Sequence, residues 1–230
     1  MSLRGVMKKN LLIGIDEVGR SSVIGPFVIA GVLADEDIIE AWEEIGVTDS
    51  KQIGNRNKIK ELSEYIKSTA LAYNIQIADA QEVDKYVSVG QYDVLERDRA
   101  RKIICTIGRH DCTVLLDGAN IFNKKFLDEF RNSRYAFDAK AYKSADCLYI
   151  VVGAASIIAK NMRDQIVDEI VNRYGKTLNL EIKGRGELNK GTIKFLKTWY
   201  EKYGYFPIET RLSFKPFRTG SIFEQFKELL

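Results

Sequence analysis

Histidine is almost absent from this chain of 230 residues, which contains only His110. A zinc site built on imidazoles needs several histidines, and a nucleophilic triad needs one beside its serine or cysteine. His110 stands in a charged turn, where we expect a solvated surface side chain. The sequence therefore disfavours both kinds of site.

Cysteine is scarce as well, and the spacing of Cys105, Cys112 and Cys147 contains no Cys-x-x-Cys pair. That spacing disfavours the common zinc and redox motifs. An odd number of cysteines inside apolar runs predicts reduced, buried thiols and a cytoplasmic location.

Long apolar runs are missing. No stretch approaches the length of a membrane span, and the first residues lack the hydrophobic core of a signal peptide. An excess of one charge is missing too, since 35 basic residues stand against 32 acidic ones and the formal net charge is +3. We expect no membrane association, and any affinity for a polyanion must come from local clusters of charge.

The hydrophobic pattern alternates between strands and helices, and 45% of the residues are hydrophobic, enough for a sizeable core. Strands are predicted at residues 11–15, 26–33, 70–78, 112–117 and 135–141, and helices at 38–45, 56–67, 91–107, 154–174 and 192–203. This order predicts an α/β fold, a mixed sheet flanked by helices over residues 1–174. Residues 175–230 are expected to form a helical C-terminal lobe that packs on the sheet domain and is not an independent domain.

Acidic residues stand where the predicted strands end. Asp16 and Glu17 follow the first strand, Asp117 closes another, and Asp146 precedes an apolar helix. Adjacent strand residues point to opposite faces, so Asp16 and Glu17 share a metal only if the backbone bends or one acts through water. Taken singly, an aspartate at a strand end is more often a turn or capping residue.

Oxygen ligands without histidine suit hard cations such as Mg²⁺ and Mn²⁺. Two such ions held by shared carboxylates activate a water molecule and stabilise the leaving oxygen in phosphodiester cleavage. Metal-assisted phosphoryl hydrolysis is the chemistry that this residue set favours.

The acids belong to a series of short motifs that extends along most of the chain. The motifs are residues 14–20 (Gly-Ile-Asp-Glu-Val-Gly-Arg), 24–26 (Ile-Gly-Pro), 46–51 (Gly-Val-Thr-Asp-Ser-Lys), 116–118 (Leu-Asp-Gly), 145–146 (Ala-Asp), 153–160 (Gly-Ala-Ala-Ser-Ile-Ile-Ala-Lys) and 163–164 (Arg-Asp). In this order they resemble the motifs of type 2 ribonucleases H, the family of ribonucleases HII and HIII. The resemblance implies a ribonuclease H-like fold. It also implies an endonuclease that hydrolyses the RNA strand of RNA–DNA hybrids with two Mg²⁺ or Mn²⁺ ions and leaves 5′-phosphate and 3′-hydroxyl ends.

By the same resemblance, the catalytic metal-ligand positions are taken by Asp16, Glu17, Asp117 and Asp146. The aspartate at position 146 resembles ribonuclease HII, because HIII has glutamate there and an extra N-terminal domain for which this chain has no room. Asp-Glu-Val-Gly and the pair Leu148-Tyr149 are similar to HIII. We therefore expect a divergent member nearer to ribonuclease HII.

Two positions depart from the ribonuclease HII pattern. The family's Gly-Arg-Gly loop reads the ribose 2′-hydroxyl, whereas this chain has Gly19-Arg20-Ser21. A serine Cβ can conflict with a conformation that glycine adopts, or crowd the close approach of the loop to the nucleic acid. The family also places a tyrosine at the RNA-to-DNA junction, where this chain has Gly186. Weakened recognition of a single embedded ribonucleotide is expected, with cleavage of ribonucleotide tracts retained.

Contacts to nucleic acid are expected from Gly19, Arg20, Ser21, Lys51, Ser156, Lys160 and Arg185. Lys51 can hold a phosphate or be a solvated lysine beside a cap, and Ser156 can contact substrate or allow close packing. Lys183, Lys190, Lys194 and Lys197, with Arg211 and Lys215 beyond them, either form a basic face for the duplex or are ordinary solvated surface. The aromatic residues 199–206 are interpreted as packing residues.

The sequence thus predicts a ribonuclease H that is a monomer, with an RNA–DNA duplex as its partner and no obligatory protein partner. A nuclease of the same fold that acts on another duplex, or only on longer ribonucleotide tracts, is one alternative. A hybrid-binding protein that does not cleave is another, but carboxylates gathered without a metal would repel one another. The four acids therefore favour an enzyme.

Overall fold

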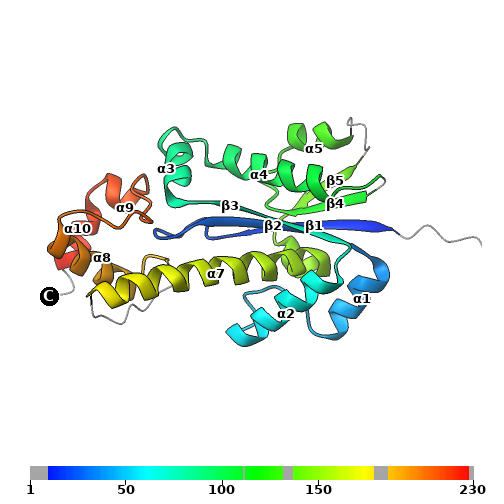
Figure 1. Cartoon of the computed structure of the whole chain (residues 1–230). Helices are drawn as coiled ribbons and strands as arrows, with labels where there is room; N and C mark the ends of the chain where they lie inside the picture. Colours follow the sequence, from blue (N-terminus) through cyan, green and yellow to red (C-terminus); the bar gives the residue numbers. More distant parts are fainter. Residues whose placement is uncertain (1–9, 111, 132–136, 179–185, 228–230) are drawn as a thin grey trace, which may run out of the picture. The chain divides into compact units, whose positions relative to one another are not determined.

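A computed structural model describes residues 10–110, 112–131, 137–178 and 186–227 (Figure 1). A sheet of five strands has the order β3-β2-β1-β4-β5. The strands are β1 (Leu11–Val18), β2 (Phe27–Asp35), β3 (Ala72–Ala78), β4 (Cys112–Asp117) and β5 (Asp138–Tyr142). All five predicted strands are present, within a few residues of the expected bounds.

Helices separate the strands in the predicted alternation. They are α1 (Glu36–Glu44), α2 (Arg56–Thr69), α3 (Ala80–Ser88), α4 (Tyr92–Ile107), α5 (Lys124–Arg131), α6 (Ala145–Leu148), α7 (Ile150–Leu178), α8 (Lys190–Tyr203), α9 (Lys215–Arg218) and α10 (Ser221–Lys227). Five of these (α3, α5, α6, α9 and α10) were not predicted, and the tail is more helical than its pattern indicated. All but α3 have eight residues or fewer, too short for a clear period of 3.6 residues.

The middle strands are buried because they run between two helical layers. Every residue of β2 is buried. On one face, α7 approaches so closely at Gly14 that a Cβ there would lie 2.2 Å from the carbonyl oxygen of Val151. On the other, a Cβ at Gly31 would lie 2.4 Å from Ile103 of α4. These two glycines therefore allow close packing of helix on strand.

The chain divides into two compact units, each built from separated segments. The first, residues 1–16, 30–75 and 100–158, contains most of the sheet; in Figure 1, α1, α2 and the start of α7 cover one face of it and α5 the other. The second unit is residues 17–29, 76–99 and 159–230. The expected boundary at residue 174 stays a prediction.

The second unit has an aromatic core. Its buried members are Val23, Ile24, Ile170, Tyr174, Phe195, Leu196, Trp199, Ile222 and Phe226. Tyr200, Tyr203 and Phe206 pack against this cluster, which confirms their interpretation as packing residues. Tyr205 is mostly exposed, although its ring centroid lies 6.3 Å from that of Trp199.

The structure tests the expectations for His110, for the three cysteines and for membrane-spanning helices. His110 is exposed, as expected. All three cysteines are free, but only Cys112 is buried; the expected burial of Cys105 and Cys147 is wrong, because both lie on solvent-facing turns of helices. Within the described ranges, no helix has the length and apolar character needed to cross a membrane.

Candidate active site

Two of the predicted acids stand side by side at one edge of the sheet. β1 and β4 run parallel, with Ile15 paired to Leu116, so the next residues, Asp16 and Asp117, lie at the same carboxyl-terminal edge. Asp16 is only 5% exposed. Glu17 follows on β1 and is partly exposed, pointing to the opposite face by strand alternation. Parallel pairing therefore brings together acids that are 101 positions apart in the sequence.

Asp146 joins these acids through a hydrogen bond from its neighbour. The backbone N–H of Ala145 donates to Oδ1 of Asp117 at 2.7 Å, which ties the first turn of α6 to the end of β4. Ser144, just before this turn, has φ 57° and ψ 45°, a left-handed conformation that costs free energy in a residue with a Cβ. The backbone is therefore held in a strained path where it presents the buried carboxylate of Asp146.

Lys51 is the cation beside these acids. Its Nζ lies 3.3 Å from Oδ2 of Asp146. Partial burial works to lower the pKa of Lys51, but the attraction of Asp146, Asp49 and Asp16 outweighs it and raises that pKa. An ammonium that is attracted by several carboxylates occupies a strongly negative region.

The pKa of Asp117 is raised, chiefly by burial. The N–H of Ala145 lowers it, the negative charge of Asp146 raises it, and the ammonium of Lys51 lowers it. Asp117 therefore lies within the electrostatic reach of both Asp146 and Lys51. A divalent cation near these groups would favour the ionised carboxylate in the same way as Lys51 does.

A compact group of possible ligands contains two residues, Asp49 and Cys147, that were not predicted as ligands from the sequence. Ligand atoms of Asp49, Asp146 and Cys147 all lie within 4.8 Å of one another. No other such group of three occurs among the described residues, so Asp16, Glu17, Asp117 and Asp146 do not converge this tightly. Asp49 is the acid of the Thr-Asp-Ser-Lys motif, and that motif was the available signal for it.

The donor set decides which cation fits. Asp16, Asp117, Asp146 and Asp49 offer carboxylate oxygens, which suit Mg²⁺ and Mn²⁺. The thiol of Cys147 is a softer donor. Local desolvation by neighbouring atoms, together with the charges of Asp146 and Asp49, raises the pKa of this exposed thiol, which opposes the thiolate that a metal needs. The residues present fit a hard divalent cation bound by oxygen.

The loop Gly19-Arg20-Ser21 lies in the second unit. Gly19 has φ 87°, and a Cβ there would lie 2.7 Å from the carbonyl oxygen of Pro26, so glycine is required. Ser21 is exposed, and among the described residues other than glycine only Ser144 has a positive φ. The expected conflict between the Ser21 Cβ and a glycine conformation is therefore wrong, while crowding of the nucleic acid by this Cβ stays a prediction.

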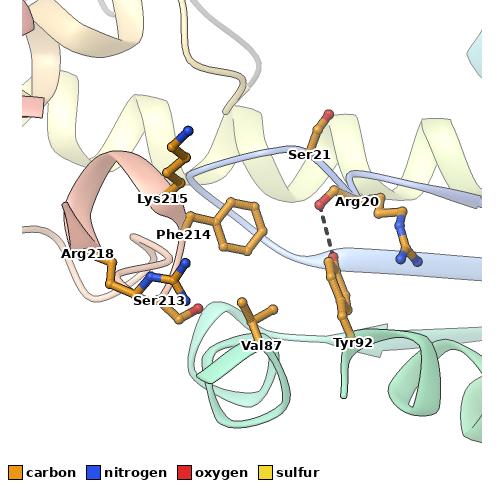
Figure 2. A pocket seen from close by; sticks show the side chains of 8 residues that line it. All are labelled: Arg20, Ser21, Val87, Tyr92, Ser213, Phe214, Lys215 and Arg218. Carbon is orange, nitrogen blue, oxygen red and sulfur yellow. Dashed lines mark hydrogen bonds between the residues drawn. The ribbon is translucent and has the colours of Figure 1, made fainter. Parts of the chain in front are cut away.

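Arg20 is engaged within the protein. Its guanidinium pairs with Asp93 and Glu96 and lies over the ring of Tyr92, 4.8 Å from the centroid. The hydroxyl of Tyr92 donates to the carbonyl oxygen of Arg20 at 3.2 Å (Figure 2). The side chain of Arg20 thus anchors the loop, and the backbone and Ser21 are the parts left to meet a ligand.

Arg211 anchors the same loop from the C-terminal segment. It is fully buried, so its expected place on a basic surface is wrong. Its guanidinium donates to the carbonyl oxygens of Gly25 at 3.0 Å and Gly19 at 2.6 Å, and to the hydroxyl of Tyr92 at 3.3 Å. One buried cation therefore fixes both ends of the loop. Sequence reasoning missed this role because the partners are backbone oxygens nearly 190 positions away.

The chain is similar to a known family over most of its length. The family model of ribonuclease HII matches residues 13–217. The chain belongs to the ribonuclease HII family. A ribonuclease HII of Pyrococcus abyssi is 34% identical over 197 residues, 84% of each chain. The ribonuclease H2 structure from Pyrococcus horikoshii superposes with a TM-score of 0.80 at 29% identity, over 95% of this chain and 99% of that one.

These matches confirm the expected fold class and identify the protein as an enzyme, a metal-dependent ribonuclease H. A ribonuclease HII from Archaeoglobus fulgidus, solved as a complex with PCNA, has a TM-score of 0.74 and 25% identity over 90% of this chain and 94% of that one. Bst-RNase HIII in complex with Mn²⁺ shares the fold, with a TM-score of 0.70 and 19% identity over 97% of this chain and 72% of that one. The higher identities to HII agree with the placement nearer to that branch.

The other residues predicted to contact nucleic acid in this ribonuclease differ in their exposure to solvent. Ser156 is 4% exposed and its hydroxyl lies 2.9 Å from that of Ser50, which favours a packing role. Lys160 is partly exposed on α7. Lys190 and Lys194 are exposed on α8, whereas Lys197 pairs with Glu201. Arg185 and Lys183 lie outside the described residues.

Gly186 has a structural role of its own in the ribonuclease. Its carbonyl oxygen accepts hydrogen bonds from the N–H groups of Val23 at 2.7 Å and Ile24 at 3.0 Å. Its φ is 80°, and a Cβ would lie 2.2 Å from the carbonyl oxygen of Ile24. A tyrosine cannot replace it without moving the backbone, so the junction tyrosine of the family has no simple counterpart at this position.

Proposed function

We propose that this ribonuclease hydrolyses the RNA strand of RNA–DNA hybrids by a mechanism with two divalent cations. We assign the metal ligands as Asp16, Glu17, Asp117 and Asp146. The observation that carries the proposal is the pairing of β1 with β4, which sets Asp16 beside Asp117, together with the Ala145 hydrogen bond that ties the turn of Asp146 to Asp117. Strand ends and a bonded turn are rigid supports for catalytic ligands.

When bound, the two cations, Mg²⁺ or Mn²⁺, supply an activated water and neutralise charge on the leaving oxygen, which leaves 5′-phosphate and 3′-hydroxyl ends. Asp16, Asp117 and Asp146 would hold them with carboxylate oxygens, and Glu17 would reach the site if the backbone bends or through water. Asp49 would support this set from beside Asp146. The Mn²⁺ complex of the HIII relative supports a hard cation of this kind.

Lys51 is assigned to the substrate phosphate. Its side chain is 75% exposed, while Asp146 fixes its ammonium end at the edge of the acidic site. An ammonium there can meet the scissile phosphate and orient it without giving up its attraction to the carboxylates. Gly19 and Ser21 would meet the ribose through their backbone, because Arg20 is committed to Asp93 and Glu96.

Discrimination of a single ribonucleotide is proposed to be weak. Gly186 offers no ring to stack on the deoxyribose beside the scissile bond, and such stacking supplies on the order of 1–3 kcal/mol. On a ribonucleotide tract, neighbouring 2′-hydroxyl and phosphate contacts position the strand instead. We further propose that the enzyme is a monomer, acts in the cytoplasm and needs no protein partner for cleavage. Because the Archaeoglobus fulgidus relative was solved in complex with PCNA, PCNA is the protein whose effect on cleavage tests the last of these points.

One cleavage assay tests the proposal. Three duplexes are compared with Mg²⁺ and with Mn²⁺: a long hybrid, a DNA duplex with four consecutive ribonucleotides and one with a single ribonucleotide. We expect cleavage of the first two and a rate about tenfold to a hundredfold lower on the third. Equal rates on the second and third would contradict weak discrimination, and no cleavage of any duplex would favour a hybrid-binding protein without turnover.

A further inference from the structure

A cavity of about 510 Å³ lies next to the loop Gly19-Arg20-Ser21, within the second unit. It is lined by Arg20, Ser21, Val87, Tyr92, Ser213, Phe214, Lys215 and Arg218 (Figure 2). This volume is in the range of sites that bind small molecules, about 300–1,000 Å³. The proposed function uses the backbone of Gly19 and Ser21 but assigns no role to the other residues around the cavity.

The lining has cations but no carboxylate. Arg20 is neutralised by Asp93 and Glu96, whereas Lys215 and Arg218 form no ion pair with any described residue. Lys215 and Arg218 are exposed and stand three residues apart in α9, so they lie on one face of a single turn. The cavity therefore presents two positive charges that nothing described in the protein neutralises.

The turn that carries these charges is held firmly. Both oxygens of the Asp84 carboxylate accept from the backbone just before α9, at 2.8 Å from Leu212 N and 3.0 Å from Ser213 N. The N–H of Arg211 donates to the carbonyl oxygen of Val23 at 2.8 Å. Fixed backbone lowers the entropy lost when the two cations bind a ligand, which distinguishes them from lysines on a free surface.

The walls between the charges are apolar and aromatic. The ring of Phe214 packs edge-on against that of Tyr92, with 6.3 Å between the ring centroids, and Val87 completes the wall. A free inorganic phosphate would use only the cations, and a hydrocarbon would use only the rings. A sugar-phosphate unit of a nucleic acid strand uses both, with its anion at Lys215 and Arg218 and its sugar against Phe214.

We infer that this cavity binds the sugar-phosphate backbone of the substrate duplex. Lys215 and Arg218 contact its phosphates, next to the loop Gly19-Arg20-Ser21. The inference rests on the proposed function only in taking a nucleic acid duplex as the ligand. Arg20 and Ser21 belong to the loop and also line the cavity. A strand that contacts the loop therefore lies next to the cavity.

The test is the salt dependence of hybrid binding, measured by fluorescence anisotropy in EDTA so that no cleavage occurs. Each phosphate contact contributes about 0.9 to the slope of log affinity against log salt concentration. We expect the variant Lys215→Gln/Arg218→Gln to show a slope shallower by about 1.8. If the two proteins bind equally at 1 M salt, this slope difference raises the dissociation constant about sixtyfold at 0.1 M salt. Lys58→Gln/Lys60→Gln on α2 removes the same charge from exposed lysines outside the cavity and serves as the matched control.

A second measurement locates the contact. Single phosphates of each strand are replaced in turn by neutral methylphosphonates, and binding is measured with the unmodified chain and with the double variant. We expect one or two linkages whose neutralisation weakens binding to the unmodified chain but not to Lys215→Gln/Arg218→Gln, because the shared contact is already lost. The charge reversal Lys215→Glu/Arg218→Glu should weaken binding further than the neutral variant.

An unchanged slope in the double variant, or a change equal to that of the Lys58/Lys60 control, would overturn the inference and leave an acidic peptide as the ligand to test. A linkage effect that is the same in both proteins would overturn it as well. Failure of the proposed function is separate, since a chain that cleaves no hybrid still gives a binding slope in EDTA.

Discussion

The ammonium of Lys51 and the carboxylate of Asp146 form an ion pair of 3.3 Å in which the partners differ greatly in exposure, 75% for the lysine side chain and 1% for the aspartate. A buried carboxylate is thus reached by one cation that also faces solvent. The pair joins the Thr-Asp-Ser-Lys motif to the turn of α6 across 95 positions of sequence. This relationship leads to the first two predictions.

Replacing Asp146 by asparagine keeps the size of the side chain and removes the charge. We expect turnover on a long hybrid to fall by about 10²-fold or more, while hybrid binding changes little, because the lost interaction serves the transition state. Single-turnover kinetics and anisotropy separate the two effects. Asp128→Asn on α5, a surface carboxylate paired with Arg131, is the control. Equal losses of binding and cleavage in a folded Asp146→Asn protein would identify a substrate contact and not a metal ligand.

Replacing Lys51 by methionine keeps the aliphatic stem and removes the ammonium. We expect kcat/KM on a long hybrid to fall by about tenfold to a hundredfold, with partial recovery in Lys51→Arg, because a phosphate contact is lost. The measurement is initial rate against hybrid concentration. Lys58→Met provides the control for removal of an exposed lysine. Unchanged kinetics would mean that Lys51 serves only to pair with Asp146.

Ser144 tests the strained turn before Asp146. In Ser144→Gly the left-handed conformation carries no Cβ penalty, so stability should change by less than about 1 kcal/mol and activity should be retained. In Ser144→Val, a branched side chain in that conformation should lower the free energy of unfolding by about 1–3 kcal/mol and reduce turnover through displacement of Asp146. Urea denaturation measures the stability of the two variants, and a cleavage assay on a long hybrid measures their turnover. A valine variant as stable as the original protein would show that the turn has an alternative path.

Arg211 tests the support of the loop. Arg211→Lys keeps the charge but cannot reach the oxygens of both Gly25 and Gly19, so buried carbonyl groups lose their donors. We expect a loss of about 2–4 kcal/mol in the free energy of unfolding and a raised KM for hybrid with kcat less affected. Arg173→Lys, which alters an exposed arginine paired with Glu209, is the matched control. A variant with lowered stability and an unchanged KM would limit Arg211 to a structural role.

Tyr92 predicts an alkaline limit to the stability of the same loop. Burial is the main cause that raises the pKa of Tyr92 to about 12, from 10.0. The folded state thus holds the phenolic proton more tightly than the unfolded state. The contribution of Tyr92 to the free energy of unfolding is therefore complete below pH 10 and is lost as the pH rises towards 12. Between pH 9 and 11 the original protein should lose about 1 kcal/mol more than Tyr92→Phe in urea denaturation. An identical loss in both proteins would contradict the raised pKa.

The parts of the fold that the sequence alone determined are those with a local cause. Strands β1, β2 and β4 are continuous apolar runs, and each long helix repeats its apolar residues over several turns, so the pattern of a single segment specifies them. The positions of Asp16, Asp117 and Asp146 at the ends of such segments could be read in the same way. Short helices such as α6 have too few turns for a period and were missed.

Tertiary structure decided what depends on distant partners. Arg211 was expected at the surface, because an arginine in a polar tail usually lies there. It is buried instead, and its guanidinium donates to the backbone carbonyl groups of Gly19 and Gly25. A sequence pattern does not indicate which backbone carbonyl groups lack a partner. The tight contact of Gly186 with Ile24 and the left-handed Ser144 likewise arise only when the segments are packed together. A hydrophobic pattern specifies which side of a segment is buried, whereas hydrogen bonds to the backbone depend on which segment covers that side.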